Sequence, residues 1–128
     1  MDSEQFWELI EAGKKDVDKL QKQIEELPEP ELVDFYWRLE ERAADLQGER
    51  FQKHMDEDLS EDSIDDLTAW VVRQGEDYFE DVNADPSEIP SEVPEGGARE
   101  SYTGRIVKLY RQRYDKMVRA REDPPPDE

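Results

Sequence analysis

The chain has 128 residues, of which 41% are charged, and it carries a net charge of −19. It contains no cysteine, which excludes disulfides, thiolate metal sites and cysteine nucleophiles. No apolar run approaches the ~20 residues that a membrane span requires, and the acidic start lacks the basic region of a signal peptide, so we expect a cytoplasmic protein.

The first stretch of the chain has the spacing of an amphipathic helix. From Phe6 to Leu27 the apolar residues recur at alternating intervals of three and four, which predicts a helix over about 3–26. Gly13 lies within this apolar stripe. The alternative is therefore that the helix breaks near Gly13 and that Asp16 starts a second one.

A second apolar stripe from Leu32 to Leu46 predicts the next helix, with Gly48 as a left-handed C-cap. Because the connection between the two stripes is short, we expect an N-terminal antiparallel helical hairpin. Residues 49–58 are more polar and predict at most one short helix, carrying Phe51 and Met55.

The clearest amphipathic pattern follows Ser60, a good N-cap residue, and predicts a helix over about 61–83. Gly75 falls on its apolar side, where we expect it to allow close helix approach rather than to break the helix. The other side is almost wholly anionic, and Trp70 lies at the boundary between the two. This pattern gives the candidate partner-binding residues: Asp62, Asp65, Asp66, Trp70, Glu76, Asp77, Glu80 and Asp81.

Prolines at every fourth position predict an extended, Pro-rich loop over about 84–98, laid along the protein through Ile89 and Val93. A basic C-terminal helix over about 99–121 should follow, with Met117 on its apolar side. Residues 122–128 should form a disordered, acidic tail. No stretch alternates as a strand would. We therefore expect an all-α fold, a compact bundle of four to five helices in a single domain over 1–121.

Charge is divided unevenly along this chain. Residues 1–98 carry 30 acids against nine Lys/Arg, or −21, whereas Arg99–Arg121 carries eight Lys/Arg against two acids, or +6. So negative a body disfavours nucleic acid and anionic lipid as ligands. The basic helix has three possible roles: it docks near the acidic face, it offers a positive edge to a partner, or it contacts nucleic acid.

Three stretches of the sequence carry a more specific resemblance: Trp70-Val-Val-Arg-Gln-Gly75, Phe6-Trp7-Glu-Leu-Ile10, and Leu27-Pro28 with Leu32 to Phe35. Over roughly residues 4–90 they resemble the bacterial domain-of-unknown-function family 4240. One departure lies at residues 48–58, which are more polar than the apolar helix that the family usually has there. The resemblance implies a mostly helical domain and names no catalytic residue.

No catalytic or metal-binding pattern stands out. The lone histidine, His54, has acids nearby and is interpreted as a surface residue. Asp56 to Asp62 resembles an EF-hand loop, but Glu61 occupies the position that needs Gly and Leu67 the position that needs Glu. We expect no resident metal and no cofactor, since the chain also lacks Glu-x-x-His pairs and Gly-rich phosphate loops.

The leading hypothesis is a non-enzymatic, acidic protein-binding module that captures a basic partner. A concrete form is an immunity or inhibitor protein, or a nucleic-acid mimic, in the positive cleft of a nuclease or similar toxin. Two alternatives stay open: a helical regulatory or housekeeping domain whose acidity serves solubility only, and an enzyme with a carboxylate-bound divalent metal. The sequence identifies neither the partner nor the oligomeric state.

Overall fold

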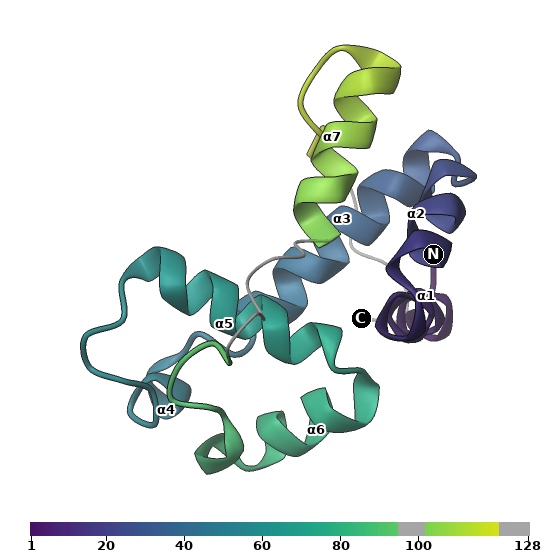
Figure 1. Cartoon of the computed structure of the whole chain (residues 1–128). Helices are drawn as coiled ribbons and strands as arrows, with labels where there is room; N and C mark the ends of the chain where they lie inside the picture. The colour runs from purple at the N-terminus through teal and green to yellow at the C-terminus, as the bar shows by residue number, and fades with distance from the viewer. Residues whose placement is uncertain (95–101, 121–128) are drawn as a thin grey trace. The chain divides into compact units, whose positions relative to one another are not determined.

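A computed structural model describes residues 1–94 and 102–120, and all regular structure in these residues is helical (Figure 1). This confirms the predicted all-α class, but the described residues form seven α-helices where four to five were expected. The predicted tail over 122–128 and the end of the predicted Pro-rich loop lie outside the described residues. The elements in chain order are α1 (Ser3–Lys15), α2 (Val17–Glu25), α3 (Glu29–Ala44), α4 (Glu49–Gln52), α5 (Glu61–Arg73), α6 (Glu76–Ala84), the 3-10 helix η1 (Pro86–Glu88) and α7 (Tyr102–Tyr114).

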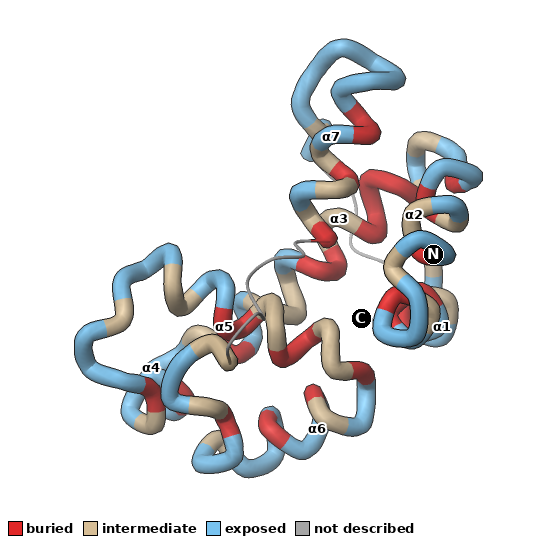
Figure 2. The backbone as a smooth tube through the Cα atoms, in the orientation of Figure 1, coloured by how far each residue is buried: buried red, intermediate tan, exposed pale blue. Residues whose placement is uncertain are grey.

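The chain forms two compact units, and the boundary between them falls inside α3. The first unit contains Met1–Leu39 and Tyr102–Glu128, and the second contains Glu40–Ser101. Buried residues recur along the helices of each unit, separated by exposed ones (Figure 2). The single domain over 1–121 stays a prediction.

The predicted first helix is in fact two helices, which meet at Asp16. This residue has extended backbone angles (φ −158°, ψ 106°), and its N–H donates to the carbonyl of Ala12 at the end of α1. Its carboxylate accepts from the N–H of Asp18 and so caps α2. The continuous helix over 3–26 was therefore wrong, and the alternative restart at Asp16 was right. The first arm of the expected hairpin is a pair of packed helices, α1 and α2; its antiparallel pairing with α3 stays a prediction.

The core of the first unit draws on all four of its helices. Phe6 of α1 makes an edge-on ring contact with Phe35 of α3, with 5.7 Å between ring centroids. Burying a side chain of this size stabilises a fold by roughly 1.5–3 kcal/mol. One ion pair is buried here as well, since the Arg38 side chain is fully buried and its Nε lies 3.2 Å from the Asp34 carboxylate. The other apolar side chains that are almost fully buried are Ile10, Leu20, Ile24, Leu32, Val33, Ile106 and Tyr110.

Helix α7 ends at Tyr114, well before the predicted end at 121, while residues 99–101 and 121 of that prediction lie outside the described residues. The next residue, Asp115, has a left-handed backbone (φ 55°), which ends the helix. Met117, expected on the apolar side, is instead 55% exposed because it lies beyond this turn.

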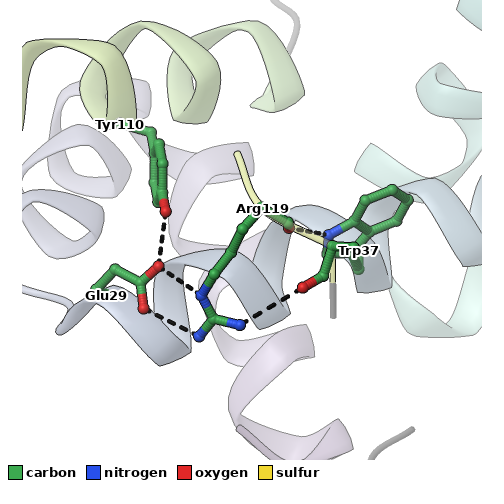
Figure 3. Close-up of polar contacts among 5 residues, drawn as sticks. Glu29, Trp37, Tyr110 and Arg119 are labelled. Carbon is green, nitrogen blue, oxygen red and sulfur yellow. Dashed lines mark hydrogen bonds and ion pairs between the residues drawn. The ribbon is translucent and has the colours of Figure 1, made fainter. Parts of the chain in front are cut away.

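The segment after α7 is held to α3 by a polar cluster (Figure 3). The Glu29 carboxylate accepts from Nε and Nη2 of Arg119, at 2.8 and 3.0 Å, and from the Tyr110 hydroxyl at 2.7 Å. The indole N–H of Trp37 donates to the Arg119 carbonyl at 2.9 Å. The hydrogen bonds from Arg119 and Tyr110 lower the pKa of Glu29, whereas burial and then the bond to Glu29 raise the pKa of Tyr110.

The second unit buries side chains from α4, α5, α6 and the loop after η1. Phe51 of α4 is 1% exposed and Met55 is 7% exposed, but Met55 lies beyond the end of α4, so the predicted short helix carries only Phe51. Gly48 is not the predicted left-handed C-cap, because its φ is −69° and it begins α4. The Pro-rich loop packs through Ile89, which is buried, and through Val93, which is half-buried. Its backbone is held where the N–H of Asp56 donates to the Ser91 carbonyl.

Replacing Gly13 by Ala should destabilise the first unit. A Cβ at this position would lie 2.5 Å from the Tyr102 hydroxyl oxygen and 2.9 Å from a methyl carbon of Leu20, and both of those side chains are buried. Alanine is the better helix former by about 1 kcal/mol, but overpacking costs more. We expect a net loss of about 1–2 kcal/mol in the free energy of unfolding, measured by urea denaturation. Gly48→Ala is the matched control, since a Cβ there meets nothing within 4 Å; equal effects of the two substitutions would contradict the packing argument.

Replacing Glu29 by Gln should lower stability at neutral pH by about 1 kcal/mol, because it removes the charge that pairs with Arg119. The folded-state pKa of Glu29 lies below its usual 4.5, so the carboxylate stabilises the protein fully above that pH. This contribution is lost as the pH falls through the folded-state pKa. The difference in melting temperature between the parent and the variant should therefore be constant from about pH 7 to 5 and shrink below that.

Circular dichroism on heating measures this difference. Glu26→Gln, an exposed neighbour, controls for the general benefit of removing one acid from so negative a chain. An undiminished difference at about pH 3 would contradict the assignment.

Candidate functional site

The candidate partner-binding residues lie on two helices rather than one. Gly75, with φ 108° and ψ 171°, separates α5 from α6 and begins the latter. Only glycine adopts such a conformation readily, because any Cβ would clash with the backbone. The prediction of one helix over 61–83 was therefore wrong, as was the prediction that Gly75 would not break it. We call the two helices and the carboxylates they carry the acidic surface.

All seven predicted carboxylates of the acidic surface are exposed. One of them, Asp65, accepts from the side-chain amide of Gln47 at 2.8 Å, and the same amide donates to Thr68. The other six form no ion pair with any Lys, Arg or His of residues 1–94 and 102–120: Asp62, Asp66, Glu76, Asp77, Glu80 and Asp81. The helix break at Gly75 offsets part of this negative charge. Glu76 and Asp77 occupy the first turn of α6, where the helix dipole favours negative charge.

The carboxylates of α6 repel one another. Partial burial, followed by repulsion from Glu80 and Asp77, raises the pKa of Glu76. A cation placed against these groups would relieve the repulsion. The acidic surface is therefore better suited to a positively charged ligand than to a neutral one.

Trp70 and Tyr78 connect α5 to α6 across the break. Their rings are nearly perpendicular (89°), with centroids 5.7 Å apart, and both side chains are half-buried. Burial, followed by the charge of Glu88, raises the pKa of Tyr78. The sequence singled out Trp70 but missed Tyr78, which looked like a core residue of a continuous helix. A helix break predicted at Gly75 would have put Trp70 and Tyr78 on two adjacent helices, where their side chains can meet.

The two units differ sharply in charge. Residues 40–94 carry 18 acids against four Lys/Arg, or −14, whereas residues 1–39 with 102–120 carry 12 acids against 11 Lys/Arg, or −1. Basic side chains of α7 and the segment after it bind within their own unit. Arg105 donates to Gln21, Arg113 to the carbonyls of Leu27 and Glu25, and Arg119 pairs with Glu29. All of these contacts lie within the first unit, so the predicted docking of the basic helix near the acidic face stays a prediction.

Other candidate chemistry is limited. Among residues 1–94 and 102–120, no three His, Asp or Glu side chains gather as metal ligands would. His54 is half-buried rather than fully on the surface. Its charge is the smallest influence on Asp85, whose pKa is lowered mainly by hydrogen bonds from Ser87. In the described part of the chain, no helix has the length and hydropathy to cross a membrane. The expectation that the protein is not an enzyme stays a prediction.

Fold and site together define an all-α protein with an exposed acidic surface on two consecutive helices. The family model of DUF4240, described as a protein of unknown function, matches residues 1–116, so the chain belongs to this family. The match extends beyond the residues 4–90 expected from the sequence motifs and takes in α7. No curated protein and no solved structure matches the chain.

Replacing Gly75 by Ala should strain the turn between α5 and α6. Because the observed φ of 108° is almost restricted to glycine, we expect the free energy of unfolding to fall by about 1–3 kcal/mol in urea denaturation. Gly48→Ala again serves as the control, since its backbone angles suit any residue. A Gly75→Ala protein as stable as the Gly48→Ala protein would show that the turn is not fixed by this backbone conformation.

Proposed function

We propose that this protein is a non-enzymatic binding module whose acidic surface captures a basic protein partner. The observation that carries the proposal is the set of six exposed carboxylates that form no ion pair among the described residues. Residues 40–94 of the unit in which they lie carry −14, whereas residues 1–39 with 102–120 of the other unit carry −1. Acidity needed only for solubility would not have to be concentrated in this way.

The acidic surface should affect the association rate of a basic partner more than it affects the affinity. Uncompensated charge of one sign steers an oppositely charged protein toward the surface, and salt screens this attraction. A concrete form is an immunity or inhibitor protein, or a nucleic-acid mimic, that occupies the positive cleft of a nuclease or similar toxin. The cytoplasm is the compartment in which we expect the encounter.

Neutralising three acids of this surface tests the proposal. Asp66→Asn, Asp77→Asn and Glu80→Gln together should slow association with a partner recovered by pull-down by roughly tenfold at low salt, measured by surface plasmon resonance. The matched control removes three exposed acids from other elements of the same unit: Glu49→Gln, Glu57→Gln and Glu92→Gln. Both triple variants have the same net charge, so a larger effect of the first reports on the position of the acids.

The outcomes separate the alternatives. Equal effects of the two triple variants, or binding that salt does not weaken, would contradict the acidic surface as the binding site. Failure to recover any basic partner would favour a regulatory or housekeeping domain that is acidic for solubility. Tight stoichiometric binding of magnesium, manganese or calcium in calorimetry, with an activity lost on mutating Asp62 and Asp65, would favour the metal enzyme.

A further inference from the structure

Two polar groups of the Trp70–Tyr78 pair are unpartnered among the described residues. Neither the indole N–H of Trp70 nor the hydroxyl of Tyr78 has a hydrogen-bond partner among residues 1–94 and 102–120, and neither is buried. The indole of Trp37 differs, because its N–H is bound to the Arg119 carbonyl. The Trp70–Tyr78 pair therefore presents half-buried aromatic rings that no hydrogen bond of their polar groups ties to the described residues, and it lies within the acidic surface.

Carboxylates flank this pair along both helices. Asp66 precedes Trp70 by four residues on α5, and Asp81 follows Tyr78 by three on α6, spacings that put side chains on the same helix face. Glu88 is close enough to act on the hydroxyl of Tyr78. The one cation of α5 and α6 is Arg73, so negative charge predominates around the rings.

We infer that the Trp70–Tyr78 pair is a docking point for an arginine side chain of the partner, in preference to lysine. The inference rests on the proposed function and names the type of partner residue that the acidic surface binds. A guanidinium is planar and weakly hydrated, so it stacks on an aromatic ring while its N–H groups pair with carboxylates. An ammonium is a strongly hydrated point charge that gains mainly from the carboxylates.

Both interactions, stacking of a guanidinium on an aromatic ring and its pairing with a carboxylate, occur within this chain. In the second unit, the guanidinium of Arg50 lies over the ring of Phe51, 4.7 Å from its centroid. In the first unit, Arg119 binds both oxygens of Glu29. Trp70 offers a larger aromatic face than Phe51, with carboxylates on the same helices.

Two peptides of equal charge, octa-arginine and octa-lysine, test the inference by calorimetry at low salt. The parent protein should bind octa-arginine about fivefold more tightly than octa-lysine. Trp70→Leu should remove most of this preference by weakening octa-arginine binding, with octa-lysine binding nearly unchanged. Trp70→Phe, which keeps a smaller ring and is the less disruptive change, should retain part of the preference. Melting temperatures establish that each variant is folded.

The first unit supplies a matched control. Tyr36 and Trp37 form a similar perpendicular ring pair, with centroids 5.1 Å apart, in the first unit, whose residues 1–39 and 102–120 carry −1. Tyr36→Leu should leave the arginine preference intact. A preference that survives Trp70→Leu, or that falls equally in Tyr36→Leu, would overturn the inference.

The two proposals fail in different ways. If both peptides bind the parent equally and neutralising Asp66, Asp77 and Glu80 weakens both, the arginine docking point is overturned and the acidic surface is supported. If neither peptide binds, or neutralising those acids changes nothing, the acidic surface itself is contradicted.

Discussion

Repulsion among carboxylates acts on every part of this chain. The first unit offsets it with Lys and Arg side chains, and the second unit has few such side chains. The first unit brings its 12 described acids together with 11 Lys/Arg, more than half of which come from α7 and the segment that follows. Arg119 and Glu29 make the clearest pair, with the Tyr110 hydroxyl as a further donor. The described residues of the second unit, 40–94, have four Lys/Arg for 18 acids, and most of these carboxylates are exposed.

Short helices suit so acidic a chain. Each helix N-terminus carries partial positive charge, and a carboxylate in the first turn gains roughly 0.3–1 kcal/mol from it. All helices from α1 to α6 have at least one acid in the first turn. The breaks at Asp16 and Gly75 create two further N-termini. In contrast, α7 has no acid in its first turn, and Arg111 and Arg113 lie in its last turn, as the dipole prefers.

The break at Gly75 also shapes the candidate binding surface. It divides the carboxylates between two helices and brings the Trp70 ring onto Tyr78. Half-buried aromatic rings among acids that form no ion pair with the described residues are the feature that links the fold to the proposed capture of a basic partner. In the proposed function, such a surface would combine long-range steering by charge with short-range selection by ring stacking.

The sequence by itself determined the all-α class, the restart at Asp16 as an alternative, and the anionic side of residues 61–83. Helical periodicity, capping and exposed charge are properties of neighbouring residues, so they can be read locally. Only the tertiary structure decided that Gly75 breaks the helix, that α7 ends at Tyr114, and that Arg119 pairs with Glu29 across 90 positions. The Arg119–Glu29 pair joins residues distant in sequence, and the two helix ends follow from the positive φ angles of Gly75 and Asp115, neither of which helical periodicity reveals.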